Sequence, residues 1–187
     1  MAHSSNVITH GMSGMVGDTI VFRQVGGKTV VAAAPKPTTK DPSVLQQQQR
    51  LKFQEAIIYG KRAMADPSKK AAYEASAKES ESAFNVAVAD LLNAPDIESI
   101  DISAYKGKTG DKISITAIDD FAVTDVFVSI YNADGSLVEE GPAVLGDDGI
   151  RWQYTAIVNN DSLTDDKIII KAGDLAGNLS QKEQPLV

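Results

Sequence analysis

The hydrophobic periodicity of the chain changes from helical to strand-like at Pro95, and this change constrains the fold more than any other feature. Between residues 42 and 94 the apolar residues recur mostly three or four positions apart, which is typical of amphipathic helices. After Pro95 they alternate with polar residues in short runs, which is typical of strands with one buried face. The sequence therefore predicts an α+β protein whose helices and strands occupy separate stretches of the chain.

The stretch from residue 95 to residue 187 predicts an antiparallel β-sandwich, because several strand-like runs are separated by turn-forming sequences such as Asn132-Ala-Asp-Gly135. Trp152 and Tyr154 fall on the same face of one run, where core packing is favoured over a sugar-binding platform. The predicted runs cover residues 112–118, 126–131, 137–138, 152–157 and 167–172.

Two Asp-Pro-Ser sequences predict helix starts, with Asp41 and Asp66 as N-caps and a proline in each first turn. The first helix is expected over residues 42–65 and the second from residue 67 to Asn93-Ala94-Pro95, and together they form an α-helical hairpin. The apolar stripe expected on the first helix consists of Leu45, Phe53, Ile57, Gly60 and Met64.

A β-hairpin is predicted after Asp18, because two β-branched runs flank Gly26-Gly27 and Pro35 ends strand pairing. An isolated hairpin is marginal in water, so its apolar residues need a partner surface in this chain or in another subunit. The assembly residues expected on this basis are Ile20, Phe22, Val30 and Val31.

These patterns divide the chain into three segments. Residues 1–17 are small, polar and glycine-rich and are expected to form a flexible tail. Residues 18–94 hold the β-hairpin and the helical hairpin, and residues 95–187 hold the sandwich.

The stretch from Asp119 to Ser180 resembles bacterial immunoglobulin-like domains. The resemblance is carried by Asp119-Asp120-Phe121, by a central Trp152 and by the closing sequence Ala172-Gly-Asp174-Leu-Ala-Gly177-Asn178-Leu-Ser180, and it covers about a third of the chain. It implies an immunoglobulin-like β-sandwich used for scaffolding, adhesion or spacing, and it implies no reaction.

The amino-terminal half resembles small bacterial proteins of uncharacterised function. This second resemblance is carried by Gly14-Met-Val-Gly17, by Pro35 and by the segment from Asp41 to Phe53. It implies no particular activity.

The charge is unevenly distributed. Residues 1–94 hold 11 Lys and Arg against 8 Asp and Glu, a net +3, whereas residues 95–187 hold 7 against 17, a net −10. This distribution argues against a nucleic-acid partner, because the basic excess is small and the acidic half repels phosphates.

No apolar run is long enough for a membrane helix, so we expect no membrane insertion. No classical signal peptide begins the chain, so we expect synthesis in the cytoplasm. A virion-like or extracellular assembly is a further expected destination.

Catalytic chemistry finds little support in the residues. The chain has no cysteine, and His3 and His10 are the only histidines. The glycines at 11, 14 and 17 follow a polar tail instead of a strand, which argues against a dinucleotide loop. We therefore expect that the protein is not an enzyme.

Four oxygen-bearing residues near predicted strand ends are weak candidates for a calcium site, since calcium binds carboxylate and amide oxygens. They are Asp119, Asp120, Asp174 and Asn178. The alternative that these residues only shape turns is favoured, so no cofactor is expected apart from this candidate calcium.

The favoured function is a non-enzymatic structural subunit that joins copies of itself or other protein subunits in a phage-like particle, a tail-like device or a filament. Exchange of the amino-terminal strands would supply the contact. The alternative is a ligand-binding or adhesion module that holds calcium or a glycan on the sandwich loops.

Overall fold

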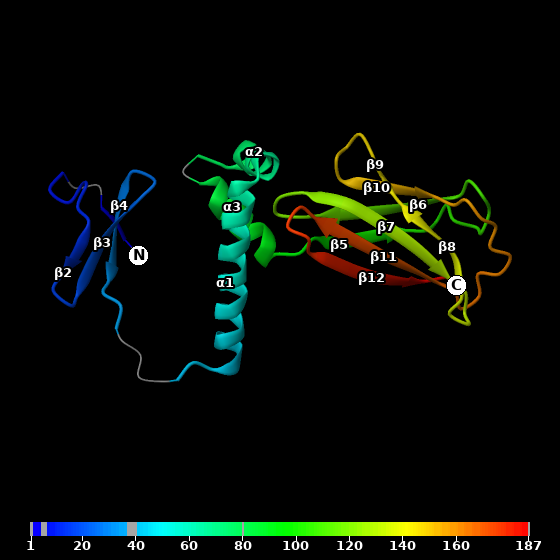
Figure 1. Cartoon of the computed structure of the whole chain (residues 1–187), viewed down its shortest axis with the longest axis horizontal. Coiled ribbons are helices and arrows are strands. Elements are labelled where there is room, and N and C mark those ends of the chain that lie inside the picture. The colour runs from blue at the N-terminus through cyan, green and yellow to red at the C-terminus, as the bar shows by residue number, and fades with distance from the viewer. Residues whose placement is uncertain (1, 5–6, 37–40, 80, 187) are drawn as a thin grey trace. The chain divides into compact units, whose positions relative to one another are not determined.

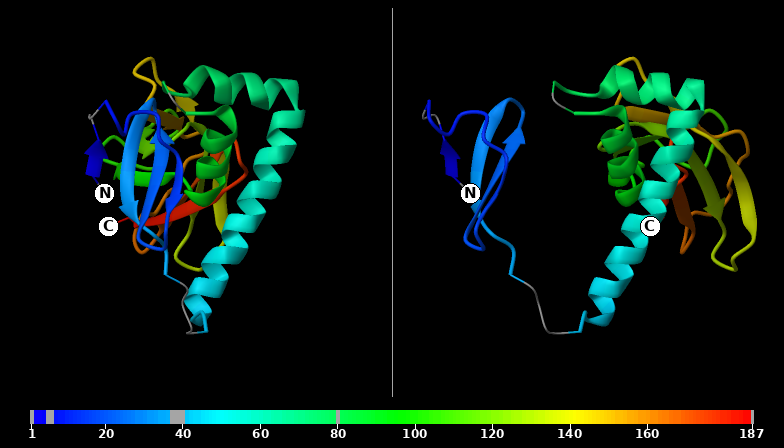
Figure 2. Two further views of the ribbon diagram at one scale, coloured as in Figure 1. Left: turned by 90° about the vertical axis from the view of Figure 1, so that its left-hand side faces the viewer. Right: turned by 60° about the vertical axis from the view of Figure 1, so that its left-hand side comes forward.

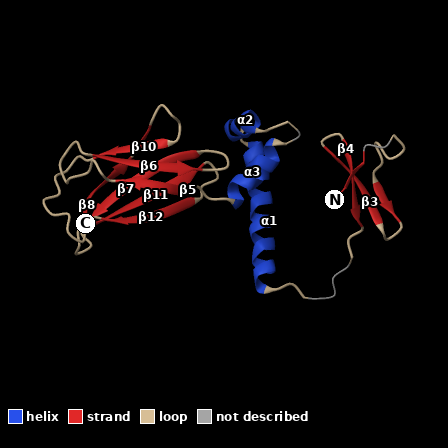
Figure 3. Ribbon diagram, turned by 180° about the vertical axis from the view of Figure 1, so that it is seen from behind, coloured by secondary structure: helices blue, strands red, loops and turns tan. Residues whose placement is uncertain are grey.

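The computed structural model describes residues 2–4, 7–36, 41–79 and 81–186. The chain divides into two compact units, residues 1–47 and residues 48–187. Strands, helices and then further strands follow one another along the chain, so the α+β organisation is confirmed (Figures 1 and 3). These two units differ from the three segments expected from the sequence, which end after residues 17 and 94. The residues of the expected tail form strands of the first sheet, and the helices pack against loops of the sandwich.

The first unit contains one antiparallel sheet with the strand order β1-β4-β3-β2. The hairpin predicted around the two glycines is confirmed, since Gly26 and Gly27 adopt φ values of 54° and 71° and Val25 pairs with Lys28. Positive φ at both central residues is the requirement of a type I′ turn. The bounds are Ala2–Ser4 for β1, Gly14–Val16 for β2, Ile20–Val25 for β3 and Lys28–Ala33 for β4.

The tail expected over residues 1–17 therefore contains two strands, although residues 1, 5 and 6 lie outside the described residues. Met15 and Val16 provide a short β-forming sequence that pairs with β3. Gly17, at a φ of 56°, allows the tight reversal between β2 and β3.

Helix α1 spans Val44–Ala65 and is capped by Ser43 instead of Asp41. The Gln46 amide N–H donates to Ser43 Oγ, and the Ser43 N–H donates to Gln46 Oε1. This reciprocal pair is a capping box, which explains why the helix begins after the Asp-Pro-Ser sequence.

The second predicted helix is two helices, α2 over Pro67–Ser76 and α3 over Ala83–Leu92. Asp66 caps α2 as predicted, by accepting from the N–H groups of Ser68 and Lys69. Ser82 caps α3 by accepting from the Asn85 N–H. Residues 78–82 read Lys-Glu-Ser-Glu-Ser in the sequence and offer no apolar side chain for a buried helix face, which favours the break.

The buried stripe of α1 also differs from the predicted one. Its buried residues are the small Ala56, Gly60 and Ala63, whereas Leu45 and Phe53 are exposed. A Cβ atom at Gly60 would lie 2.9 Å from side-chain atoms of Phe84 and Val88, so the missing side chain is what allows α3 to approach α1 (Figure 2).

None of the helices in the described part of the chain is long and apolar enough to cross a membrane.

Two four-stranded antiparallel sheets follow the helices, with the orders β5-β6-β10-β9 and β12-β11-β7-β8. The first sheet contains β5 (Asp96–Asp101), β6 (Lys112–Ile118), β9 (Val144–Leu145) and β10 (Arg151–Thr155). The second contains β7 (Val123–Tyr131), β8 (Leu137–Pro142), β11 (Lys167–Asp174) and β12 (Leu179–Pro185).

The two sheets pack face to face on a shared apolar core (Figure 1). Ile113 and Ile115 of β6 meet Val128 of β7 and Ile170 of β11 in this core. Trp152 and Tyr154 are both buried in it, which confirms core packing for this pair. The alternating burial along β6 and β10 follows the alternation of apolar and polar residues in the sequence.

Candidate functional site

The candidate site lies where helices α2 and α3 meet the ends of two sandwich strands. Tyr73 of α2 is completely buried, and its ring centroid lies 4.6 Å from that of Phe121, in the turn between β6 and β7. Leu175, directly after β11, packs against the same small apolar cluster. The helices are therefore joined to the sandwich by apolar contacts around one tyrosine.

A chain of hydrogen bonds crosses this junction. The Tyr73 hydroxyl donates to Asp90 Oδ2, and since it carries one hydrogen it accepts from the Tyr59 hydroxyl at 2.7 Å. The Lys69 ammonium donates to the Tyr59 oxygen at 3.4 Å and to the Leu175 carbonyl at 3.2 Å. These hydrogen bonds lead from Lys69 to the buried carboxylate of Asp90 in α3.

Three carboxylates gather at the end of this chain. Oxygen atoms of Asp90, Asp119 and Asp174, one from each residue, all lie within 4.8 Å of one another. Asp90 lies in α3, Asp119 follows β6, and Asp174 ends β11. We call this group the carboxylate cluster, and it joins one helix to both sheets of the sandwich.

The carboxylate cluster is shielded from water. Asp90 is 1% exposed and Asp174 is 6% exposed, while Asp119 is half-buried. Oδ1 of Asp90 and Oδ1 of Asp119 are buried without a hydrogen-bond partner in the described part of the chain. Burial and the neighbouring carboxylates destabilise the ionised form of Asp90.

The pKa values agree with this environment. Burial raises the pKa of Asp90 to about 6, the nearby carboxylates of Asp174 and Asp119 act in the same direction, and the hydrogen bond from Tyr73 acts against them. Burial, together with the hydrogen bond to Asp90, raises the pKa of Tyr73 far above its usual value. Tyr73 is therefore a neutral donor at every physiological pH.

Asp120 and Asn178, the other two calcium candidates from the sequence, have different partners. Asp120 is exposed and accepts a hydrogen bond from the Asn93 side-chain amide. The side-chain amide of Asn178 donates to the carbonyls of Asp90 and Asn93 and to Asp174 Oδ2. Asn178 thus ties the end of α3 to the turn after β11, and its amide nitrogen cannot bind a metal ion.

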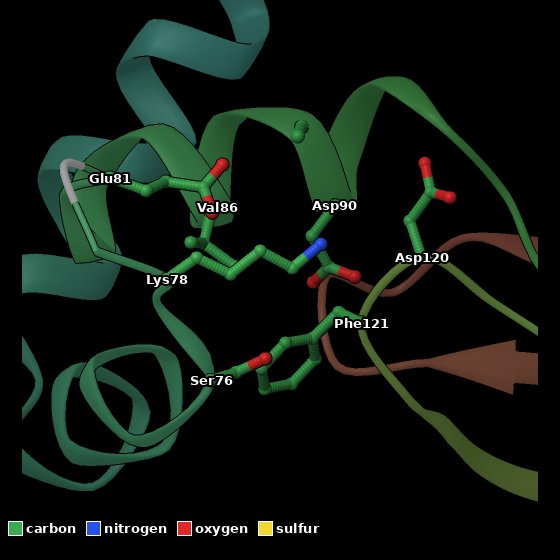
Figure 4. A pocket seen from close by; sticks show the side chains of 8 residues that line it. Ser76, Lys78, Glu81, Val86, Asp90, Asp120 and Phe121 are labelled. Atoms are coloured by element: carbon green, nitrogen blue, oxygen red, sulfur yellow. The ribbon is translucent and has the colours of Figure 1, made fainter. Parts of the chain in front are cut away.

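A pocket of about 210 Å³ opens beside the carboxylate cluster. Asp90, Asp120 and Phe121 line it together with residues from the end of α2 and from α3 (Figure 4). The pocket lies beside Asp90, which is itself buried.

The four assembly residues predicted from the hairpin lie on both faces of the amino-terminal sheet. Phe22 pairs with Val31 and Ile20 pairs with Ala33, so Ile20, Phe22 and Val31 share one face. Val30 pairs with Arg23 and lies on the opposite face, where it is buried.

Sequence reasoning missed Asp90. The available signal was its isolation, because it is the only charged residue in the sequence Ala-Phe-Asn-Val-Ala-Val-Ala-Asp-Leu-Leu of α3. A lone carboxylate on an otherwise apolar helix needs a partner when the helix is buried.

Compared with known proteins, the chain matches no family model and shows significant similarity to no curated protein.

Proposed function

We propose that the protein is a non-enzymatic structural subunit whose amino-terminal unit associates with other copies of the chain. The observation that carries the proposal is a set of exposed apolar side chains on that unit, which we call the amino-terminal apolar surface. Val16 and Ile20 are paired on one face of the sheet, Met15 and Val25 lie on the other face, and Met12 precedes β2.

The composition of the amino-terminal sheet supports this role. Among the described residues of the unit only Thr29, Val30 and Ala34 are buried. A single sheet buries its apolar side chains only when a second layer covers it. Exposed apolar residues on both faces of a single sheet leave apolar area uncovered, and such area is typical of protein interaction surfaces.

The distribution of charge supports a second copy as the partner. Residues 1–47 hold 4 Lys and Arg against 2 Asp and Glu, a net +2, and residues 48–187 hold 14 against 23, a net −9. Opposite net charges favour contact between the amino-terminal unit of one copy and the acidic unit of the next. Such a head-to-tail contact produces rings or filaments, in keeping with a particle, a tail-like device or a filament.

Strand exchange is the form of contact that we favour. The edge strands β1 and β2 of the amino-terminal sheet have three residues each, and β1 pairs with β4 over Ala2–Ser4. A short terminal strand contributes little to its own sheet, so it can leave that sheet and pair with a strand of the neighbouring copy.

We further propose that the sandwich is immunoglobulin-like. The support is the order of its strands, β5-β6-β10-β9 facing β12-β11-β7-β8. Lettered A to G with an additional C′, this is the order A-B-E-D facing G-F-C-C′ that immunoglobulin-type sandwiches use. Domains of this architecture commonly serve as spacers and scaffolds, and the architecture alone assigns no reaction.

A ligand-binding or adhesion role is the second candidate function. The carboxylate cluster favours it, because buried carboxylate oxygens that lack a hydrogen-bond donor are a means of binding a cation. The two functions are compatible, since the cluster belongs to the unit of residues 48–187.

A pair of matched variants tests the association. Val16 and Ile20 face each other across β2 and β3, so the double variant Val16→Asp/Ile20→Asp places two charges on the amino-terminal apolar surface. Val144→Asp is the control, because Val144 is 71% exposed on an edge strand of the other unit, compared with 61% for Val16. Light scattering should give a mass near 19.9 kDa for the double variant and a larger mass for wild type and control.

Equal masses for all three proteins would overturn the proposed surface. Removal of residues 1–34 gives an independent result, because the shortened chain should stay folded and monomeric. If it unfolds instead, the hairpin belongs to the core of its own subunit.

A further inference from the structure

We propose that Asp90, Asp119 and Asp174 bind one divalent cation of the calcium type, which fixes helix α3 to both sheets of the sandwich. This proposal is independent of the proposed association, because every ligand belongs to the unit of residues 48–187.

The spacing of the oxygens fits calcium. Calcium binds oxygens at about 2.3–2.6 Å, so two oxygens on opposite sides of the ion lie at most about 5.2 Å apart. The three carboxylate oxygens lie within 4.8 Å of one another, inside that limit. Magnesium demands near-ideal octahedral geometry and is usually held by one or two carboxylates and several waters, so a site with three carboxylates suits calcium better.

The second observation is the unpartnered oxygen of Asp90. This side chain is 1% exposed, and its Oδ1 atom has no hydrogen-bond partner in the described part of the chain. Oδ1 of Asp119, on the opposing turn, has none either. Uncompensated buried carboxylates strongly disfavour folding, and a bound cation removes that cost.

Among the described residues, no cationic side chain neutralises the carboxylate cluster through a salt bridge, although the charge of Lys69 favours the ionised form of Asp90. None of the salt bridges in the described part of the chain involves a residue of the carboxylate cluster. Lys69, the cation linked to the cluster through Tyr59 and Tyr73, donates instead to Tyr59 and to the Leu175 carbonyl.

Each carboxylate is held by bonds of the kind that orient metal ligands. Asp119 Oδ2 accepts from the N–H groups of Phe121 and Ala122, at 3.2 Å and 3.1 Å. Asp174 Oδ1 accepts from the N–H groups of Gly177 and Asn178, both at 2.7 Å. The Tyr73 hydroxyl holds Asp90 through Oδ2. These bonds fix the three side chains before a cation arrives, and water entering from the pocket beside Asp90 would complete the coordination.

Two measurements test the site on the full-length protein. Calorimetric titration with calcium should give one site per chain, and the melting temperature should rise with calcium and fall on adding a chelator. Terbium(III) takes the same oxygen ligands and is excited by nearby tyrosines, so Tyr73 should sensitise its luminescence. Calcium should displace terbium at lower concentrations than magnesium does.

Neutral variants of equal shape identify the ligands. Asp90→Asn should weaken calcium and terbium binding by more than about tenfold, because it removes a charged ligand. Asp120→Asn is the control, since Asp120 is the exposed neighbour of Asp119 and lies outside the cluster. It should bind both ions as wild type does. If Asp90→Asn fails to fold, Asp119→Asn is expected to show the same loss of calcium and terbium binding.

Three results would overturn the proposal. They are the absence of calcium and terbium binding at millimolar ion concentrations, binding that survives in Asp90→Asn and Asp119→Asn, and equal loss in the Asp120→Asn control.

Discussion

The hydroxyl of Tyr73 donates a hydrogen bond to Oδ2 of Asp90, with 2.5 Å between the two oxygens. Tyr73 belongs to α2 and Asp90 to α3, and both are buried where the helices meet the sandwich. This bond connects the apolar cluster around Phe121 with the carboxylate cluster, so the packing of the helices and the charge of the site depend on each other.

Replacing Tyr73 by Phe tests that dependence. Tyr73→Phe keeps the ring against Phe121 but removes the donor to Asp90 Oδ2, while the Tyr59 hydroxyl keeps Lys69 and the Leu175 carbonyl as partners. The free energy of unfolding should fall by about 1–3 kcal/mol, the usual cost of leaving a buried polar group unpaired. Urea denaturation measures it, and an unchanged midpoint would mean that the bond contributes nothing to stability.

Asn178 offers a second test with a matched control. Asn178→Asp removes the amide that donates to the carbonyls of Asp90 and Asn93 and adds a charge next to Asp174. It should lower the free energy of unfolding by at least about 1 kcal/mol and increase amide hydrogen exchange in α3. Asn159→Asp is the control, because Asn159 only accepts, through Oδ1, from the N–H and hydroxyl of Thr109.

The free energy of unfolding should therefore fall more in Asn178→Asp than in Asn159→Asp. If both lose the same stability, or if exchange in α3 stays slow in Asn178→Asp, the amide of Asn178 does not hold the helix.

Alanine substitutions at two glycines distinguish the cost of backbone strain from the cost of a steric clash. Gly107 has a φ of 79°, and a Cβ atom there would lie 2.4 Å from the carbonyl oxygen of Asn160. Gly110 has a φ of 95° with no atom within 4 Å of the same position. Gly110→Ala should cost about 1–2 kcal/mol for the left-handed conformation alone, and Gly107→Ala should cost more. Thermal or urea unfolding compares them, and equal losses would contradict the close approach at Gly107.

Acid should weaken the sandwich partly through Asp111. The N–H groups of Lys108 and Lys106 donate to its carboxylate and hold its pKa below the usual 3.8. A depressed pKa in the folded state gives stability that is complete above the unfolded value and is lost as the pH falls through the folded value. The stability of wild type should therefore decline more steeply below about pH 4 than that of Asp111→Asn. Urea midpoints across a pH series measure this, and parallel curves would exclude the contribution.

Local sequence signals predicted local structure well. The turn at Gly26-Gly27 and the cap at Asp66 both depend on neighbouring residues alone, and both are confirmed. Strand β6 has the predicted bounds of residues 112–118, because its apolar residues alternate without interruption. The start of α1 was misplaced because Asp41 and Ser43 are both good caps, and the reciprocal bond with Gln46 decides between them.

The carboxylate cluster was predictable only in part. Asp119 and Asp174 stand out near strand ends, but their distance from each other depends on how the two sheets pack. Asp90 joins them because Gly60 and Tyr73 let α3 settle against its neighbours, and that packing has no signature in the residues around Asp90. Tertiary contacts between distant segments therefore determine the site.

The molar mass of the full-length protein in solution tests the central claim most directly. Light scattering over a concentration series, at low and at high salt, should give a mass that exceeds 19.9 kDa and grows with concentration. Salt should reduce the mass, because it screens the attraction between the oppositely charged units. A mass of 19.9 kDa at every concentration and salt level would contradict the proposed association between copies.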